Sequence, residues 1–339
     1  MPKADPPPTP TGSIHPRPTP HPRQLPWAAA FSVLLAALLA FPSLVPNTPG
    51  HPGSLLETFL PWLGLAVPLL LIRALLRRSA ATALALLLPT AAWLGQFGSL
   101  LPHTAPHTTP GTAHHPDLTT VQHNISDENP DPSRTASALA ATDPDLIAVE
   151  ELTPAAVTAF TAALAAGYPH HATHGTVGLW SKYPLTDVRP VDIRPASLGP
   201  DWNRALRATA ATPRGPVAVY VVHLPSLRLG PTGFGSARRD ESAVLLGSVL
   251  TAEPADRVVL LGDLNSTTDD RALAPLRAAR MNTPDPATGP TGFAFTWPAS
   301  FPLARIDQVL ARSGTVTRVR ALPATGSDHL PLTAEIRFD

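Results

Sequence analysis

Three long apolar segments near the amino terminus restrict the fold of this chain more than any other feature. They occupy residues 27–45, 59–76 and 80–101, and each is close to the roughly 20 residues that a helix needs to cross the hydrocarbon core of a bilayer. Arg73 lies near the end of the second segment, where its side chain can reach the membrane interface. A cleaved signal peptide is the alternative for the first segment, but two further apolar segments follow it. We therefore expect a three-helix transmembrane region at residues 27–101.

Basic residues alternate between the two sides of these segments. Lys3, Arg17 and Arg23 precede the first segment, and Arg73, Arg77 and Arg78 lie at or after the end of the second. The loop between the first two segments has no Lys or Arg, and after the third segment none occurs before Arg134. Because Lys and Arg concentrate in cytoplasmic loops, this pattern predicts a multi-pass protein of the cell membrane with a cytoplasmic N-terminus. The C-terminal domain is then extracytoplasmic.

Proline-rich stretches flank the membrane region. Residues 1–26 hold many of the 43 prolines without any apolar periodicity, which predicts a disordered cytoplasmic tail. Residues 102–116 form a polar, proline-punctuated linker. Its four histidines are His103, His107, His114 and His115. They could bind a metal ion, but no regular helix or loop pattern frames them, so a solvated spacer is favoured.

The composition excludes several kinds of site. The chain has no cysteine, so it has neither disulfides nor thiolate metal sites, and a metal ion must be held by oxygen or imidazole ligands. Lys and Arg total 25, as do Asp and Glu, so no overall basic charge attracts nucleic acid. We therefore expect no stable nucleic-acid partner. The sequence does not indicate any protein partner.

Residues 117–339 alternate short β-rich runs with helical ones. The predicted strands are TTVQHNI, DLIAVEE, TVGLWSK, NRALRATAA, PVAVYVVHL, RVVLLGDL, RIDQVLA and LTAEIRF. Helices are predicted at 133–142, with Ser133 as N-cap, from Thr153 to Gly167, and at about 236–250. Many strands with few helices predict an α+β or α/β sandwich, built as one domain.

Polar residues follow the apolar strands, where a rigid scaffold presents functional groups. In chain order they are Asn124, Glu151, His223, Asp263, Asn265, Asp307, Ser327, Asp328 and His329. Any one of them could be an ordinary turn residue. Their repeated placement at strand ends favours a common site.

The motifs that carry these residues resemble a known family. QHNIS, DLIAVEEL, GLWSKYPL, VVHLPS, LLGDLN, RIDQVL and GSDHLPL are similar to the successive motifs of the endonuclease/exonuclease/phosphatase (DNase-I-like) superfamily. The resemblance covers about residues 118–339. It implies a four-layered α/β/β/α sandwich, here preceded by the three transmembrane helices, and a metal-dependent phosphoric ester or pyrophosphate hydrolase.

The resemblance also implies which residues hold the metal ion. Glu151 corresponds to the main Mg²⁺ ligand, Asn124 lies beside it, and Asp328 completes the carboxylate set. Glu150 stands where the family often has Gln, so we take Glu151 as the ligand. Mg²⁺ prefers such oxygen ligands, Mn²⁺ is the alternative, and zinc held by histidines is disfavoured.

The remaining motif residues correspond to the groups that act on the phosphate. Asp263 would activate or orient the attacking water, and Asn265 would hold the phosphate. His223 and His329 would donate hydrogen bonds to phosphoryl oxygens, and Asp307 would orient His329. A carboxylate beside an imidazole raises its pKa and fixes its tautomer, which favours the donating form.

Two features stand apart from the motifs. Some nucleases carry an acidic ligand two residues after the Asn, where this chain has Ser126, which argues against close kinship with abasic-site endonucleases. Arg204 and Arg207 could grip a substrate phosphate, although solvated surface positions are favoured.

The expected partners are the lipid bilayer and a phosphorylated lipid-type substrate, because a tethered active site meets membrane-surface substrates at high effective concentration. The layout is also similar to the actinomycete teicoplanin-resistance membrane proteins of the VanJ type. That likeness implies an undecaprenyl-pyrophosphate-like substrate and a link to glycopeptide resistance. The alternatives are a cell-surface nuclease and a catalytically inactive membrane receptor on the same fold.

Overall fold

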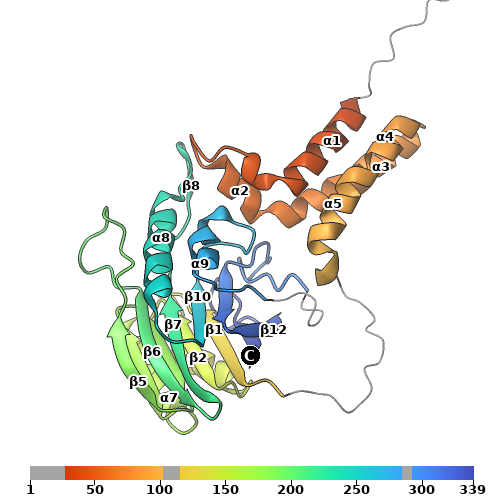
Figure 1. The fold of residues 1–339 in the computed structure, drawn as a ribbon. Helices are drawn as coiled ribbons and strands as arrows, with labels where there is room; N and C mark the ends of the chain where they lie inside the picture. The colour runs from red at the N-terminus through yellow and green to blue at the C-terminus, as the bar shows by residue number, and fades with distance from the viewer. Residues whose placement is uncertain (1–26, 102–114, 285–291) are drawn as a thin grey trace, which may run out of the picture.

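The computed structural model describes residues 27–101, 115–284 and 292–339 and has two parts. A helical part, residues 27–100, stands on one end of a β-sandwich formed by the rest of the described chain (Figure 1). The tail predicted at residues 1–26 lies outside the described residues. So does most of the linker predicted at residues 102–116, with His103, His107 and His114.

The helical part, called here the N-terminal bundle, consists of short helices. They are α1 (Trp27–Ala40), η1 (Pro42–Leu44), α2 (Pro52–Thr58), η2 (Leu60–Leu65), α3 (Ala66–Leu76), α4 (Ala80–Ala85), α5 (Leu87–Phe97) and η3 (Gly98–Leu100). Leu35, Leu39, Leu60 and Phe97 form its buried core.

Among the described residues, only Ala80–Leu100 forms a single helix long and apolar enough to cross a membrane; its 21 residues span about 31 Å. The second predicted span, residues 59–76, corresponds to the longer member of a helix pair, Pro52–Thr58 and Leu60–Leu76, that bends by 72°. The first is a helix of 14 residues, about 21 Å long, which is less than the roughly 30 Å core of a bilayer. Pro42 and Pro61 lie at these interruptions, and proline cannot donate the hydrogen bond that continues a helix. The prediction of three spans is thus matched by one helix, or by two if the bent pair crosses as a broken span.

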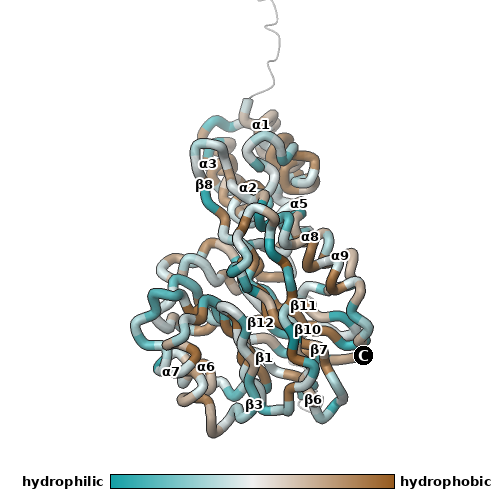
Figure 2. Tube along the Cα trace, turned by 90° about the vertical axis from the view of Figure 1, so that its left-hand side faces the viewer, coloured by the Kyte–Doolittle hydropathy of each residue, from teal (hydrophilic) through white to brown (hydrophobic). Residues whose placement is uncertain are grey.

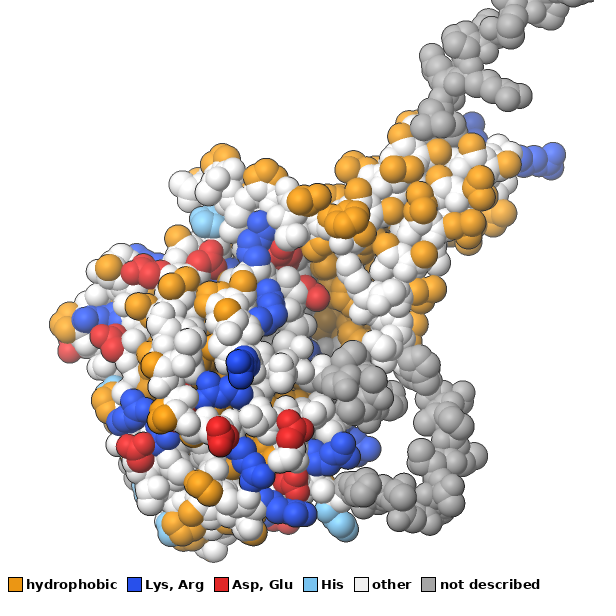
Figure 3. Space-filling view, in the orientation of Figure 1, with side chains coloured by type: hydrophobic (Ala, Val, Ile, Leu, Met, Phe, Trp, Pro, Cys, Tyr) orange, Lys and Arg blue, Asp and Glu red, His pale blue; other side chains and the backbone are white. Residues whose placement is uncertain are grey.

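The outer surface of the N-terminal bundle is largely apolar (Figure 3). Leu34, Leu69, Leu75 and Leu84 are each more than half exposed. Arg side chains, coloured blue, appear at the tip that points away from the sandwich. Apolar surface of this extent is typical of an interaction site rather than of a solvated face.

Two mixed sheets form the sandwich. The six-stranded sheet has the order β12 (Gly314–Ala321), β13 (Leu332–Phe338), β1 (Leu118–Asn124), β2 (Leu146–Glu150), β4 (Val177–Ser181), β3 (His170–His174). The five-stranded sheet has the order β11 (Asp307–Arg312), β10 (Val258–Asp263), β7 (Gly215–Val222), β6 (Ala205–Thr212), β5 (Leu185–Pro190). A small hairpin joins β8 (Leu229–Gly230) to β9 (Gly233–Phe234).

Helices cover the outer face of each sheet (Figure 2). The six-stranded sheet is covered by α6 (Pro132–Ala140) and α7 (Pro154–Leu164), and the five-stranded sheet by α8 (Ala237–Ala252), η4 (Arg271–Leu273) and α9 (Ala274–Ala278). Along β2, Leu146 and Ala148 face the core between the sheets, whereas Ile147 and Val149 face the helices. Burial on both faces explains why the strand is a continuous apolar run. The α+β sandwich with four layers, α/β/β/α, is therefore present.

Local signals place the helix ends. Thr153 caps α7 as predicted, since its side chain accepts a hydrogen bond from the Ala156 N–H. The prediction for α6 was wrong by two residues, because Asp131 rather than Ser133 is the N-cap and accepts from the Arg134 N–H at 2.9 Å. Asp131 is followed by Pro132 at the first helical position, which favours that start.

A buried ion pair fastens the N-terminal bundle to the sandwich. The Glu57 carboxylate in α2 accepts three hydrogen bonds from Arg271, from its backbone N–H, Nε and Nη2, each at 2.9 Å. Glu57 is 1% exposed, and a paired, multiply bonded carboxylate is the form in which a buried charge is tolerated. The Trp62 indole N–H also donates to the carbonyl of Leu303 at 2.7 Å. The bundle is therefore held to the sandwich by specific polar contacts.

Candidate active site

The strand directions bring the predicted residues to one end of the sandwich. In one sheet β1 and β2 are parallel and end at Asn124 and Glu150. In the other, β7 and β10 are parallel, and β10 ends at Asp263. Asp307 begins β11, which runs antiparallel to β10, and pairs with Asp263. Carboxyl ends of parallel strands and amino ends of their antiparallel neighbours meet at the same edge, so the site follows from the topology.

The backbone geometry of the GDLN motif requires a glycine at position 262. Gly262 has φ of 151°, and a Cβ there would lie 1.8 Å from the carbonyl oxygen of Val222 on β7. The close approach of the two strands therefore requires glycine. Glu151 and Asn265 also have positive φ, 59° and 46°, which is uncommon for residues with a side chain and concentrates at functional sites.

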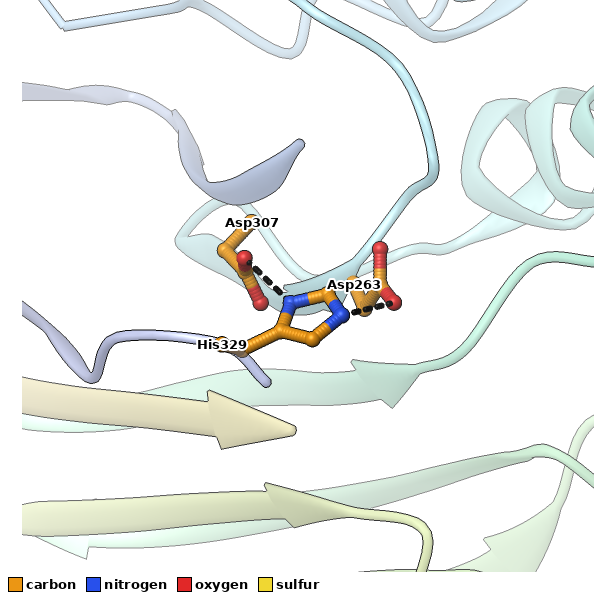
Figure 4. A group of neighbouring side chains, drawn as sticks. All are labelled: Asp263, Asp307 and His329. Atoms are coloured by element: carbon orange, nitrogen blue, oxygen red, sulfur yellow. Dashed lines mark hydrogen bonds and ion pairs between the residues drawn. The ribbon is translucent and has the colours of Figure 1, made fainter. Parts of the chain in front are cut away.

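Asp307 and His329 form the predicted pair (Figure 4). His329 Nδ1 donates to Asp307 Oδ2 at 2.9 Å, and its backbone N–H donates to Ser327 Oγ at 3.0 Å. Burial alone would lower the pKa of His329, but the carboxylates of Asp307 and Asp263 outweigh it and raise the pKa to about 10. His329 is thus held as an imidazolium ion whose Nε2–H points toward Asp263, with 3.8 Å between Nε2 and Oδ2.

Asp263 lies at the centre of the cluster. Its Oδ1 accepts from the Asn265 N–H at 2.8 Å, and its Oδ2 accepts from Asn124 Nδ2 at 3.1 Å. Burial raises the pKa of this carboxyl, and the charge of His329 opposes that rise. A carboxylate with a raised pKa is a better proton acceptor at neutral pH.

His223 lies between Asp263 and Glu151. Its Nε2 is 3.6 Å from Asp263 Oδ2 and 3.8 Å from Glu151 Oε1. Burial lowers the pKa of His223 well below its usual value, and the neighbouring Arg204 lowers it further. A neutral ring in which Nδ1 accepts from Arg204 Nη1, 3.1 Å away, leaves Nε2–H facing the two carboxylates.

Arg204 belongs to this site, whereas the sequence favoured a solvated surface position over a phosphate contact for it. Its half-buried guanidinium packs against His223 and lies 5.5 Å from the centroid of the Trp202 ring. Burial lowers its pKa, but Glu151 and Asp263 oppose that effect. Arg207, by contrast, is neither solvated nor near the site: it is 5% exposed and pairs with Glu253, with 3.1 Å between Nε and Oε2. The only sequence signal for Arg204 is its position immediately before β6.

Glu150 and Glu151 face different surroundings. Glu150 is fully buried and accepts a hydrogen bond from Gln122 Nε2 at 2.7 Å. Burial, together with Asp307, raises its pKa well above the usual value, which favours the neutral form. Glu151 instead lines an open cavity. The geometry thus favours Glu151 over Glu150 as a metal ligand. It also brings Gln122 into the site, because Gln122 Nε2 donates to Asp307 Oδ1 at 3.0 Å as well.

The cavity beside the cluster has a volume of about 610 Å³. Glu151, Asp328, Asp127 and Ser126 contribute to its wall, so its acidic and oxygen-bearing side chains suit a hard divalent cation. Asp263, Asp307 and His329 also place ligand atoms within 4.8 Å of one another. His329, however, is protonated and bound to Asp307, so the side with Glu151 and Asp328 is the better fit for a cation.

The predicted residues are therefore together in space. Hydrogen bonds or distances below 4 Å connect Asn124, Glu151, His223, Asp263, Asn265, Asp307 and His329. Asp328 is exposed and lines the cavity with Glu151. The fold and the cluster are those of a phosphoester hydrolase.

The comparisons with known proteins agree. Residues 121–329 match the Endonuclease/Exonuclease/phosphatase family, and the chain belongs to that family. Its members are hydrolases that act on phosphodiester bonds and typically use divalent metal ions. No curated protein matches the chain in sequence.

Solved structures share the sandwich. A humanized TDP2 of D. rerio has 19% identity and a TM-score of 0.54, covering 65% of this chain and 98% of its own. The human Nocturnin catalytic domain, with bound sulfate, has 16% identity and a TM-score of 0.54, with 67% and 96% covered. Sphingomyelinase C of Streptomyces griseocarneus has 21% identity and a TM-score of 0.50, with 65% and 99% covered. At such identities the likeness shows the fold alone.

Proposed function

We propose that the chain is a membrane-anchored, extracytoplasmic phosphoesterase that depends on Mg²⁺ and hydrolyses a lipid-linked phosphate or pyrophosphate. The observation that carries the proposal is the buried cluster of Asp263, Asp307 and His329, which His223 connects to Glu151 in the wall of the neighbouring cavity. Mn²⁺ is the alternative metal ion.

Each residue has a role that follows from its contacts. Glu151, Asp328 and Asn124 would hold the cation, which when bound neutralises charge on the phosphoryl group. Asp263 accepts a proton from the attacking water and is oriented by Asn124 and Asn265. Asn265 would in addition contact the phosphate.

Donors on the opposite side stabilise the transition state. The imidazolium of His329, held by Asp307, and the Nε2–H of His223 point toward the same space near Asp263. Arg204 adds a fixed positive charge behind His223. Phosphoryl transfer depends mainly on positioning and on charge stabilisation of this kind.

The membrane part of the proposal rests on the N-terminal bundle. One helix is long enough to cross, and the outer surface of the bundle is apolar. The turn between α3 and α4, which carries Arg77 and Arg78, lies at the end of the bundle away from the sandwich (Figure 1). That arrangement supports a cytoplasmic Arg turn and an extracytoplasmic catalytic domain.

The direct test is phosphate release by the full chain in nanodiscs with Mg²⁺. A polyprenyl pyrophosphate and a supercoiled plasmid are offered in parallel to the wild type and to Asp263→Ala. We expect release from the lipid that Asp263→Ala abolishes. Plasmid nicking without lipid hydrolysis would establish the nuclease alternative, and no metal-dependent turnover of either substrate would favour the inactive receptor.

We extend the proposal to glycopeptide resistance, on the basis of the sequence layout. Expression in a susceptible host should raise the inhibitory concentration of teicoplanin, and Asp263→Ala should not. If the inhibitory concentration of teicoplanin is the same in hosts that express the wild type and Asp263→Ala, the hydrolase activity has no part in resistance.

A further inference from the structure

A second cavity, of about 380 Å³, lies where the N-terminal bundle meets the sandwich. Trp62 and Leu65 from the η2 segment, Trp93 and Leu94 from α5, and Phe293 and Phe295 from the sandwich form most of its wall. Its volume is in the range of small-molecule sites, roughly 300–1,000 Å³. We call it the apolar pocket.

The described residues that line the apolar pocket leave no side-chain polar group free for a ligand. The indole N–H of Trp62 donates to Leu303 O at 2.7 Å, and that of Trp93 donates to Pro61 O at 2.8 Å. Thr90 is the one polar side chain on the wall, and its hydroxyl donates to Leu86 O at 2.8 Å. An occupant must therefore be a hydrocarbon, because a polar molecule would lose its hydrogen bonds to water without replacement.

Aromatic contacts keep the pocket open. Trp62 stacks on Phe295 with 5.6 Å between ring centroids, and Phe295 stacks on Phe293 at 5.1 Å. The hydrogen bond from Trp62 to Leu303 joins this stack to the sandwich. Since rings and indole N–H groups are fixed from both sides, the walls are preformed for a ligand.

One short segment joins the apolar pocket to the active site. Phe293 and Phe295 line the pocket, and Pro298, Ala299 and Ser300 line the cavity that contains Glu151 and Asp328. The five peptide units from residue 295 to residue 300 span at most roughly 18 Å. That distance is within the reach of a single molecule with a phosphate head and a long hydrocarbon chain.

Backbone bonds hold this segment against the catalytic histidine. Leu330 N–H donates to Thr296 O at 2.8 Å, and Ala299 N–H donates to Asp328 O at 2.7 Å. The residues on either side of His329 are thus bonded to the segment whose other end forms the pocket wall.

We propose that the apolar pocket is the subsite for the hydrocarbon chain of the lipid phosphoester, which binds with its phosphate among Glu151, Asp263 and His329. This inference rests on the proposed function and adds to it the means by which the enzyme selects a long-chain substrate. A short-chain ester with the same headgroup would use the active site without the pocket.

The test compares long-chain and short-chain prenyl pyrophosphates on the full chain in nanodiscs. Leu94→Trp fills the pocket, and Leu87→Trp, an exposed position on the same helix α5 that does not line the pocket, is the matched control. Leu94→Trp should raise KM for the long-chain substrate roughly tenfold, the equivalent of about two lost methylene contacts, and leave the short-chain substrate unchanged. Leu87→Trp should match the wild type on both.

The outcomes separate the two proposals. If the wild type hydrolyses neither substrate, the proposed function fails and the pocket assignment fails with it. If it hydrolyses the long-chain substrate and both variants behave alike, only the pocket assignment is overturned.

A binding measurement does not depend on the folding of a variant. A long-chain prenyl phosphate brominated along its chain should quench tryptophan fluorescence more than a brominated neutral lipid at the same mole fraction, because Trp62 and Trp93 line the pocket. Equal quenching by both would mean that ordinary bilayer lipid fills the pocket, and would overturn the assignment.

Discussion

Glu150 and Glu151 are neighbours with the same side chain, and they provide a matched pair at the residue scale. Glu151→Gln should lower metal-dependent turnover at least about 100-fold, because it removes a charged ligand from the cavity wall. Glu150→Gln should keep turnover within about threefold, because Glu150 is fully buried away from the cavity and an amide can still accept from Gln122. Initial rates of phosphate release measure both. Equal losses in the two variants would contradict the assignment of Glu151, rather than Glu150, as the ligand.

Arg204 is the second residue to test. Arg204→Gln should reduce turnover roughly 100-fold, because the guanidinium is fixed against His223 and supplies charge at the site. Arg194→Gln is the control: that side chain is 33% exposed and its nearest carboxylate, Asp192, is 4.0 Å away. If the two variants have the same rate, Arg204 has no part in the reaction.

The motif residues could be predicted from sequence, whereas their supporting partners could not. Asp263, Asp307 and His329 belong to sequence motifs that recur within the family, so the family resemblance identifies them as site residues. Gln122 lies inside a strand and Arg204 just before one, and only the pairing of the sheets brings them to the site. Arg207 was expected on the solvated surface because its partner, Glu253, is 46 residues away in sequence and their contact depends on the tertiary fold.

At the scale of elements, β10 depends on its glycine. Gly262→Ala should lower stability by about 3 kcal/mol or more, since the new Cβ would lie 1.8 Å from the Val222 carbonyl and φ is positive. For a domain of this size that corresponds to a fall in Tm of roughly 6–12 °C. In Gly167→Ala, where nothing lies within 4 Å of the added Cβ, Tm should change little. An unchanged Tm in Gly262→Ala would contradict the required close approach of β7 and β10.

The helix α8 is tied to β6 and β7 through Glu253, and this tie depends on pH. Burial alone would raise the pKa of Glu253, but hydrogen bonds from Arg207 and Tyr220 outweigh it and lower the pKa to about 2. Because the folded pKa lies below the usual value of 4.5, the stabilisation is complete above pH 4.5 and is lost as the pH falls toward 2. Glu253→Gln should cost about 3 kcal/mol at pH 7 and weaken the pH dependence between 4.5 and 2. Denaturant unfolding at pH 4.5 and at pH 2 measures the free energy of unfolding of the wild type and of Glu253→Gln. If that free energy changes with pH in the same way in both proteins, Glu253 is not the source of the pH dependence.

Strands buried on both faces could be predicted and exposed strands could not. β2 and β10 are continuous apolar runs, and their ends were placed within a residue or two. β5 is exposed along most of its length, and β3 is a histidine-rich edge strand, so neither shows an apolar pattern. The 72° bend lies between Thr58 and Leu60, at the start of the second apolar segment, and it was missed because hydropathy reports composition and not helix direction.

At the scale of the whole molecule, the bundle and the sandwich form a connected unit. Glu57 and Arg271 lock α2 to the sandwich, and the segment around residues 293–300 touches both the apolar pocket and the active-site cavity. The position of the catalytic edge relative to the bundle is therefore set by packing. Sequence alone predicted the two parts but not the contacts between them.

The proposed active site requires a divalent cation at the edge where the two sheets meet. Titration of Mn²⁺ into the full chain, followed by calorimetry, tests this without any substrate. We expect a saturable site that Glu151→Gln weakens at least about tenfold and that Glu150→Gln leaves unchanged. Equal Mn²⁺ affinity in Glu151→Gln and the wild type, or no binding to either, would contradict the assignment of the site.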